Sequence, residues 1–153
     1  MSNYNTKPHI DGVFEKKHRE ITITKQDLID FESDVALRWE NGEIKAPVHL
    51  SYNNEAYLIQ LFQYIHPDDW VFTTWRNHYH SLLHGVPKEE LLGSILKGNS
   101  ISFQSPKHRV YTSAIVGGIL PIAVGTALGL KYNNSERRVW CFVGDMAAEG
   151  GVS

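Results

Sequence analysis

The chain has 153 residues, of which 42% are hydrophobic and 21% are charged, a composition typical of one globular domain with a core. Its formal net charge of -2 gives no electrostatic reason to expect nucleic acid as a partner, and the single cysteine, Cys141, excludes an internal disulfide and a metal cluster of several cysteines. No apolar run is long enough for a membrane span, and residues 1–20 lack the apolar centre of a secretory signal, so we expect a cytoplasmic protein without a membrane partner.

The first predicted element after the N-terminus is a helix. Residues 1–22 are polar and aperiodic and predict an extended or partly disordered arm ahead of a domain over residues 23–153. Thr24 and Asp27 resemble a weak capping box at the start of the helix, and the Asn-Gly pair at 41–42 ends it. Its apolar positions fall at helical spacing, namely Leu28, Phe31, Val35 and Trp39.

Three more elements follow before residue 100. Residues 54–65 are rich in apolar side chains and predict a mostly buried helix, which the Pro-Asp-Asp sequence at 67–69 breaks. Residues 71–75 (VFTTW) are β-branched and aromatic and predict the first strand of a parallel sheet. Residues 87–98 begin with proline and carry two glutamates in the first turn, which indicates a short helix.

The second half of the chain predicts an α/β domain. Residues 99–113 have no sustained period and predict a surface loop, whereas residues 116–132 are rich in Gly and Ala and predict a helix packed closely on a sheet. Residues 139–143 (VWCFV) are apolar on both faces, as in a central parallel strand buried between helices. Strands that alternate with helices favour a parallel sheet. Because residues 144–153 only begin the next helix, we expect the chain to be truncated relative to its folding unit.

The end of the last strand is a candidate ligand site, since ligands of parallel sheets bind beyond the carboxyl ends of strands. Gly144 allows a sharp turn, and Asp145 is a hard oxygen donor suited to magnesium with a diphosphate. The amide groups of residues 146–148 would face an anion. Taken alone, the pattern is more often a simple turn in which Asp145 caps the next helix.

Other segments carry a resemblance that favours the ligand site. They are, in order, GEIK at 42–45, HLS at 49–51, NEA at 54–56, PDDW at 67–70, TWRNH at 74–78, AIVG at 114–117 with Pro121 and Gly125, KYN at 131–133 and FVGDMAAEG at 142–150. Together these segments resemble the alpha subunit of thiamine-diphosphate-dependent 2-oxo acid dehydrogenases, the decarboxylating component of pyruvate, branched-chain and acetoin dehydrogenase complexes. The resemblance covers about the last two thirds of the chain and implies the N-terminal half of a parallel-sheet thiamine-diphosphate-binding fold.

The resemblance also implies roles for individual residues. Asp145 is similar to the family's magnesium ligand, and Arg76 to the arginine that contacts the diphosphate. Trp75 takes an aromatic position where tyrosine is more usual, and the backbone of Ala114 and Val116 would face the aminopyrimidine ring. Without the family context, an arginine after a strand is usually a solvated surface charge.

Three further residues are implied at the site. Met146 and Ala147 would line the cofactor, although glycine is more usual in the family at the position of Met146. His49 is similar to a histidine near the reactive end of the cofactor and is a catalytic candidate for handling the 2-oxo acid, with a plain surface histidine as the alternative. Residues 99–113 lack the Gly-Gly-Ser-Met-His-like segment of the pyruvate type, so the identity of the substrate is left open.

The family's chemistry requires partners that this chain does not supply. Its members are oxidoreductases that use thiamine diphosphate and Mg²⁺ for oxidative decarboxylation with acyl transfer, and a beta-type subunit in a heterotetramer supplies the activating glutamate. We expect the chain alone to be inactive and to bind the cofactor weakly, because the second metal ligand would lie beyond Ser153. The alternatives are a transketolase-like or decarboxylase enzyme that shares only the diphosphate motif, and a non-catalytic remnant or interaction module.

Four histidines are left without an assigned role: His78, His80, His84 and His108. His80 and His84 have the i, i+4 spacing of a zinc-binding pair on a helix. Ser81 stands where a metalloprotease needs its glutamate, which argues against that class. His78 follows Arg76 closely and is therefore expected near the active site.

Overall fold

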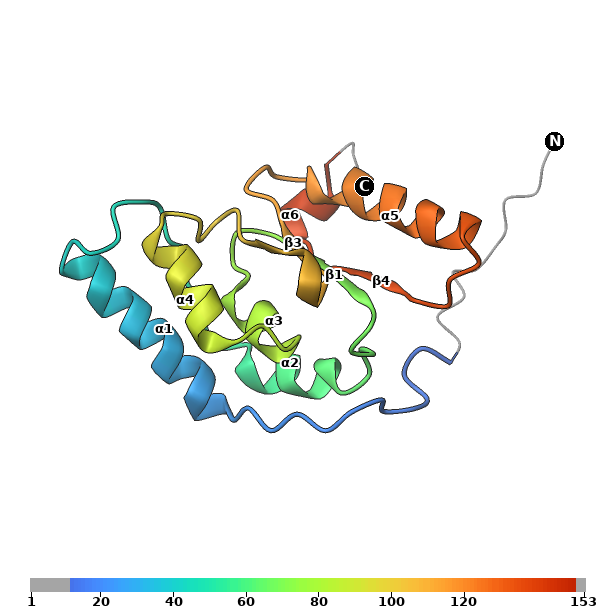
Figure 1. The fold of residues 1–153 in the computed structure, drawn as a ribbon, viewed down its shortest axis with the longest axis horizontal. Helices are drawn as coiled ribbons and strands as arrows, with labels where there is room; N and C mark the ends of the chain where they lie inside the picture. The colour runs from blue at the N-terminus through green and yellow to red at the C-terminus, as the bar shows by residue number, and fades with distance from the viewer. Residues whose placement is uncertain (1–11, 151–153) are drawn as a thin grey trace.

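The computed structural model describes residues 12–150 as helices packed on both faces of a small sheet (Figure 1). The elements in chain order are α1 (Lys25–Glu40), α2 (Glu55–Phe62), β1 (Trp70–Thr73), α3 (His78–Leu83), α4 (Lys88–Leu96), β2 (Gln104–Ser105), the 3-10 turn η1 (Pro106–His108), β3 (Val110–Thr112), α5 (Ile119–Tyr132), β4 (Val139–Cys141) and α6 (Asp145–Ala148). Among these helices, none has the length and apolar character that crossing a bilayer demands.

The sheet has four strands in the order β2-β3-β1-β4, and it is mostly parallel. β1 pairs in parallel with β3 on one side and with β4 on the other, whereas β2 runs antiparallel to β3. The prediction of a mixed α/β fold built on a parallel sheet is confirmed. The prediction that β1 is the first parallel strand is confirmed as well.

The two faces of the sheet bury different sets of side chains, because successive residues of a strand point to opposite sides. Val71 and Val110 belong to the main core, which is formed with helices α1 to α4. Phe72 faces the other way and packs with Ile119 and Ala123 of α5. Figure 1 shows the same division, with α1 to α4 on one side of the strands and α5 on the other.

Helix α1 begins and ends where its sequence predicts. The Thr24 hydroxyl oxygen accepts a hydrogen bond from the Asp27 amide at 3.1 Å, and the Asp27 carboxylate accepts one from the Thr24 amide at 2.8 Å. This reciprocal capping box satisfies two amide groups that a helix start otherwise leaves without partners. Of the predicted apolar positions, Leu28, Phe31 and Val35 are fully buried, whereas Trp39 in the last turn is 53% exposed.

Helix α2 is shorter and less buried than predicted. It spans Glu55–Phe62 and buries Leu58 and Phe62, whereas Tyr57 is 76% exposed. Only one face of the helix meets the core, and Ile65, which is also buried, lies in the chain after the helix. The apolar content of the segment overstated how much of it is enclosed.

The prediction of a surface loop over residues 99–113 is wrong. This segment contains β2, η1 and β3, and β3 lies beside the central strand of the sheet. Strands of two and three residues are too short to produce a period in the sequence, and their conformation depends on pairing with β1. Helix α5 begins at Ile119, later than the predicted residue 116, because Gly117 adopts a φ of +73° in the preceding turn.

Strand β4 is present as predicted, but its predicted central position is wrong. Within residues 12–150 it pairs only with β1 and lies at an edge of the sheet. Its three residues are therefore half-buried instead of enclosed on both faces. Burial is still sufficient to raise the pKa of the Cys141 thiol above its usual value.

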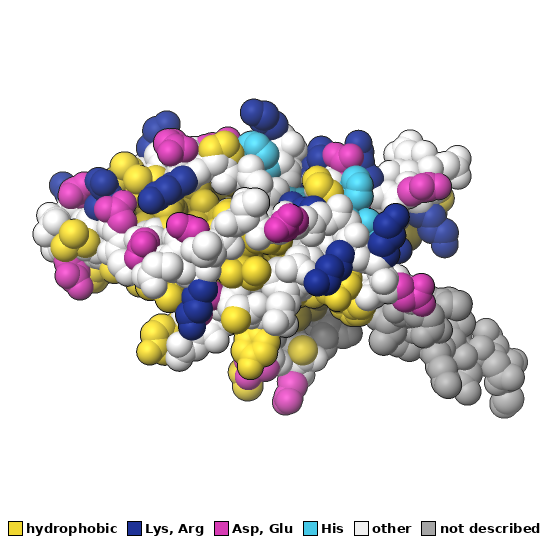
Figure 2. All heavy atoms as spheres, turned by 90° about the horizontal axis from the view of Figure 1, so that it is seen from below, with side chains coloured by type: hydrophobic (Ala, Val, Ile, Leu, Met, Phe, Trp, Pro, Cys, Tyr) yellow, Lys and Arg dark blue, Asp and Glu magenta, His cyan; other side chains and the backbone are white. Residues whose placement is uncertain are grey.

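The described part of the predicted N-terminal arm is extended and anchored to the domain. Residues 17–24 form neither helix nor strand, and the Arg19 guanidinium donates from Nε to the carbonyl of Phe62 at 3.0 Å. Residues 1–11 of the arm lie outside the described residues. Figure 2 views the molecule from the side of this segment and α2 and shows Lys, Arg, Asp and Glu side chains interspersed, without a large area of one sign.

Candidate functional site

Parallel pairing brings the predicted cofactor residues to one edge of the sheet. Thr73 at the end of β1 pairs with Thr112 at the end of β3, and Phe72 pairs with Cys141 at the end of β4. The segments that follow these three strands contain, respectively, Trp75 and Arg76, Ala114 and Val116, and Asp145, Met146 and Ala147. These seven residues come from segments far apart in the sequence, and all of them follow the carboxyl ends of neighbouring strands, which lie along one edge of the sheet.

Asp145 is the first residue of α6 and follows β4 through an extended Gly144. Its carboxylate is exposed and makes no hydrogen bond or ion pair with any residue of the described chain. Residues 12–150 contain no group of three His, Cys, Asp or Glu side chains that could enclose a metal. A lone open carboxylate fits Mg²⁺ held mainly by phosphate oxygens and water, which is the usual way in which proteins hold this ion.

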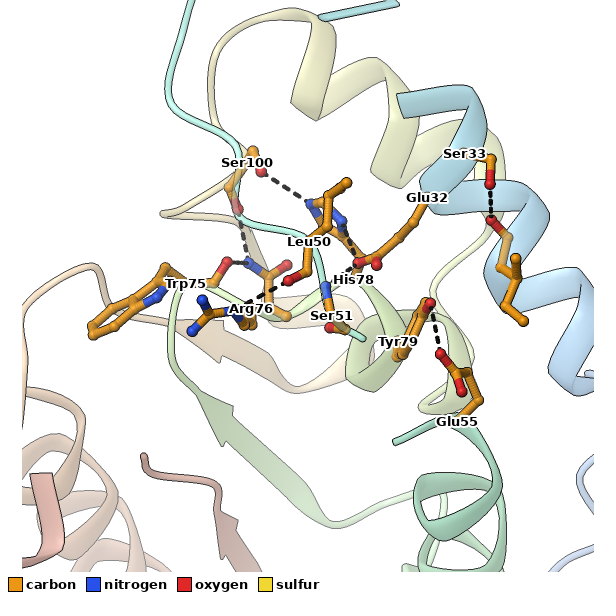
Figure 3. A network of polar contacts seen from close by, with 12 residues as sticks. Glu32, Ser33, Leu50, Ser51, Glu55, Trp75, Arg76, His78, Tyr79 and Ser100 are labelled. Atoms are coloured by element: carbon orange, nitrogen blue, oxygen red, sulfur yellow. Dashed lines mark hydrogen bonds and ion pairs between the residues drawn. The ribbon is translucent and has the colours of Figure 1, made fainter. Parts of the chain in front are cut away.

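Arg76 is exposed and is anchored at one point. Its Nε donates to the carbonyl of Leu50 at 3.1 Å, and this is the only contact of its guanidinium with the described residues (Figure 3). Both Nη groups are therefore available to an anion. Since a guanidinium can donate two parallel hydrogen bonds to a phosphate, the side chain fits a diphosphate group.

His49 and Trp75 lie side by side, although they come from different segments. The centroids of their rings are 6.1 Å apart, with the His49 ring exposed and the Trp75 ring half-buried. The contact brings residues 49–51 to the end of β1, next to Arg76. The candidate substrate residue and the candidate diphosphate ligand are thus neighbours.

The turn after β3 is tight and presents its backbone to solvent. Ala114 and Val116 are both exposed, and the amide of Ile115 is held by the Ser113 hydroxyl at 3.2 Å. A Cβ at Gly118 would come within 3.0 Å of the Cβ of Ile115, so a larger residue would force this turn open. In α6, which follows the neighbouring strand β4, the side chain of Met146 is 76% exposed and that of Ala147 is buried.

A buried polar network beneath these residues was not anticipated from the sequence. The His78 ring contacts Glu32 Oε1 through Nδ1 and Ser100 Oγ through Nε2, each at 3.0 Å. Glu32 is 4% exposed, and His78 and Ser100 are fully buried. The available signal was Glu32 itself, a charged residue that follows Phe31 on the buried side of α1 and lies four positions after Leu28.

His80 and His84 point away from this network and have structural roles. His84 donates from Nε2 to the carbonyl of Asp69 at 2.9 Å, and its Nδ1 lies 3.3 Å from the guanidinium of Arg19. The His80 ring packs edge-on against Phe142, with centroids 4.5 Å apart. Burial lowers the pKa of both histidines to about 4. With no third ligand beside them in the described chain, the zinc alternative has no support.

His108 lies at the other end of the strands, where β3 begins. It precedes β3, and its Nδ1 is 2.8 Å from the hydroxyl of Ser105. The adjacent Arg109 bonds to Asp68 and to the Pro67 carbonyl, both of which precede β1. Within the segment 99–113, Ser100 and Ser113 lie near the candidate site, whereas His108 lies at the amino ends of the strands, away from it.

Comparison with known proteins identifies related sequences over most of the chain. Residues 24–152 match the family described as dehydrogenase E1 component. The chain is 28% identical over 132 residues to the alpha subunit of acetoin:2,6-dichlorophenolindophenol oxidoreductase from Bacillus subtilis, which covers 80% of this chain and 40% of that protein. It is also 28% identical over 131 residues to the pyruvate dehydrogenase E1 component subunit alpha of Rickettsia bellii, covering 79% and 40%.

A mitochondrial relative shows a higher identity over a shorter length. The pyruvate dehydrogenase E1 component subunit alpha of Sminthopsis macroura is 33% identical over 116 residues, covering 71% of this chain and 32% of that protein. The chain thus spans about 40% of the length of the first two relatives and less of the third.

Proposed function

This chain belongs to the dehydrogenase E1 component family, and on that premise we propose that it forms part of the alpha subunit of a thiamine-diphosphate-dependent 2-oxo acid dehydrogenase. Support comes from the carboxyl edge of the sheet, where an open carboxylate, an anchored arginine and an exposed histidine follow neighbouring parallel strands or pack beside them. The three relatives are alpha subunits of acetoin:2,6-dichlorophenolindophenol oxidoreductase and of the pyruvate dehydrogenase E1 component, which favours this class over a transketolase-like enzyme or a non-catalytic remnant.

Each residue of the edge has a chemical task in this proposal. Asp145 holds Mg²⁺ through its carboxylate, and Arg76 donates from its two Nη groups to the diphosphate. The family resemblance implies that the backbone of Ala114 and Val116 faces the aminopyrimidine ring, and the exposed turn that carries them, after the neighbouring strand β3, is compatible with this role. Trp75 takes the aromatic position beside the diphosphate.

The remaining residues serve the reacting end. Thiamine diphosphate, when bound, supplies the nucleophilic carbon that adds to a 2-oxo acid and accepts the electron pair released by decarboxylation. His49, exposed and next to Trp75, donates a hydrogen bond to the substrate's carboxylate or carbonyl oxygen. Met146 and Ala147 line the cofactor after the metal ligand. A beta-type partner subunit supplies the activating glutamate, which makes the working assembly a hetero-oligomer.

Cofactor binding tests this function directly. The full-length protein is co-expressed with its beta-type partner, and thiamine diphosphate is titrated by calorimetry with and without Mg²⁺. We expect saturable binding that requires Mg²⁺, that Asp145→Ala abolishes, and that Arg76→Ala weakens about tenfold or more, since a hydrogen bond to a charged group contributes about 1.5–3 kcal/mol. Glu149→Ala, an exposed carboxylate at the end of α6, is the matched control. Binding that survives Asp145→Ala would disprove the assigned metal site.

A further inference from the structure

The peptide group between Leu50 and Ser51 is held from both sides. Its carbonyl oxygen accepts from Arg76 Nε at 3.1 Å, and its N–H donates to Glu32 Oε1 at 2.9 Å (Figure 3). The C=O and N–H of a trans peptide point in opposite directions, so Arg76 and Glu32 lie on opposite sides of one rigid plane. A rotation of this plane would break both contacts together.

The same carboxylate oxygen of Glu32 also contacts His78, which connects it back to Arg76 along the chain. Glu32 Oε1 also lies 3.0 Å from Nδ1 of His78, which follows Arg76 by two residues. Because a carboxylate oxygen can only accept, Nδ1 of His78 carries the proton, and in the neutral ring Nε2 then accepts from the Ser100 hydroxyl. These contacts form a closed circuit, which runs from Glu32 through the 50–51 peptide to Arg76, along the chain to His78 and back to Glu32.

A second tie fixes the turn between β1 and α3. Nδ2 of Asn77 donates to the carbonyl of Ser100 at 2.7 Å and to that of Trp75 at 3.2 Å. Ser100 therefore holds both Asn77 and His78, one through its carbonyl and the other through its hydroxyl. Since these groups are buried, each broken contact would leave an unsatisfied polar atom in a medium of low dielectric, which keeps the arrangement rigid.

We propose that Glu32 is a positioning residue for Arg76 that acts through the 50–51 peptide, an inference that rests on the proposed function. Arg76 uses Nε to bind the Leu50 carbonyl, and this anchor leaves both Nη groups without a hydrogen bond to the described residues. The position of the Arg76 guanidinium therefore depends on the position of the 50–51 peptide, and Glu32 fixes that peptide through its N–H group. Glu32 touches neither the cofactor nor the substrate in this scheme; it sets the geometry of the residue that does.

The second oxygen of Glu32 makes a sharp substitution possible. By distance and angle Oε2 has no hydrogen-bond partner in the described residues, but burial raises the pKa of the Tyr79 hydroxyl, and the Glu32 carboxylate lies close enough to raise it further, as does Glu55. Glu32 lines a cavity of about 240 Å³ together with Ser51 and Glu55. In Glu32→Gln, the amide oxygen can take the place of Oε1 and the NH₂ group can face the cavity, where there is room for water. Glu32→Ala removes the acceptor altogether.

Glu55 provides a matched control. It is also 4% exposed and lines the same cavity, but its carboxylate is engaged by the Tyr79 hydroxyl at 3.3 Å and by Lys25 at 3.6 Å. Within residues 12–150, no hydrogen bond or ion pair joins its carboxylate to the 50–51 peptide or to Arg76. Glu55→Ala therefore removes a carboxylate that is as buried as Glu32 and lines the same cavity, but it leaves both hydrogen bonds of the 50–51 peptide in place.

The experiment compares Glu32→Ala, Glu32→Gln and Glu55→Ala in the full-length protein with its beta-type partner. Calorimetry with Mg²⁺ gives the Kd for thiamine diphosphate, and ¹⁹F NMR of 5-fluorotryptophan protein gives the Trp75 resonance without cofactor. We expect Glu32→Ala to raise the Kd about tenfold or more and to shift the Trp75 resonance, as for other supporting residues around a metal-bound ligand. Glu32→Gln should stay within about threefold of wild type, and Glu55→Ala should change neither readout. If Glu32→Ala does not fold, Glu32→Asp, whose shorter carboxylate cannot span both contacts, replaces it.

The outcomes separate this inference from the function on which it rests. Equal effects of Glu32→Ala and Glu55→Ala, or failure of Glu32→Gln to restore binding, would overturn the positioning role while wild-type binding leaves the function standing. A wild-type protein that binds no thiamine diphosphate would overturn the proposed function. In that case, a Trp75 resonance that Glu32→Ala leaves unshifted would overturn the positioning geometry as well.

Discussion

Acidification should destabilise this domain through two buried histidines. The usual pKa of histidine is 6.5, and burial lowers that of His80 and of His84 to about 4 in the folded chain. In the unfolded chain the rings take up protons below pH 6.5, whereas the folded chain holds them neutral down to about pH 4. The stability linked to these residues is therefore fully present above pH 6.5 and is lost as the pH falls to 4.

The magnitude follows from the difference between the two pKa values. Each pH unit corresponds to about 1.4 kcal/mol, so a lowering from 6.5 to about 4 accounts for at most about 3–4 kcal/mol for one histidine and about 7 kcal/mol for the pair. A small domain has a total stability of roughly 5–15 kcal/mol. The pair alone can therefore bring the chain close to acid unfolding within this pH range.

His80→Phe isolates one of the two contributions. The His80 ring lies between Phe62 and Phe142, so an apolar ring should fit there, although it loses the contact of the imidazole with the backbone of Arg76. Urea denaturation followed by circular dichroism between pH 7.5 and 4.5 measures the free energy of unfolding. We expect the acid-induced loss to fall from at most about 7 to at most about 3–4 kcal/mol.

If His80→Phe loses as much stability on acidification as wild type does, burial of His80 is not a source of the acid sensitivity, and the reasoning fails.

Three further substitutions test the fold, each by urea denaturation at pH 7. Thr24→Ala breaks the capping box of α1 and should cost about 1 kcal/mol; no change would mean that the cap contributes nothing. Phe62→Ala removes a fully buried ring stacked on Phe142 and should cost about 3–5 kcal/mol; a cost below 1 kcal/mol would contradict the packing described for this core. Asp69→Asn replaces one acceptor oxygen by a donor and should cost about 1–3 kcal/mol with a shifted emission of Trp140, whose indole N–H bonds to that carboxylate; unchanged emission would exclude the contact.

Elements with strong local signals were predictable from the sequence. Helix α1 has a reciprocal cap and an apolar stripe, and both depend only on residues within a few positions of one another. Strands β1 and β4 stand out by their β-branched and aromatic residues, and their parallel pairing places Arg76 and Asp145 at one edge. For this reason the location of the candidate site could be inferred before the structure.

Features that depend on long-range pairing were not predictable in the same way. Strands β2 and β3 have too few residues to show a period, and they are stabilised by partners elsewhere in the chain. The contact between Glu32 and His78 joins residues 46 positions apart, and no local pattern indicates which histidine a buried carboxylate will meet. The edge position of β4 likewise depends on strand order, which composition does not determine.

The most direct test of the central claim determines at which end of β1 the metal and the diphosphate bind. Trp70 lies at the amino end of this strand and Trp75 just beyond its carboxyl end, roughly 15 Å apart along an extended chain. In 5-fluorotryptophan-labelled full-length protein with its beta-type partner, Mn²⁺ replaces Mg²⁺ with thiamine diphosphate, and the ¹⁹F resonances are assigned by Trp70→Phe and Trp75→Phe. Paramagnetic broadening falls steeply with distance, so we predict strong broadening of the Trp75 resonance and little of the Trp70 resonance. Broadening of Trp70 that equals or exceeds that of Trp75 would place the metal away from the carboxyl edge and contradict the proposed site.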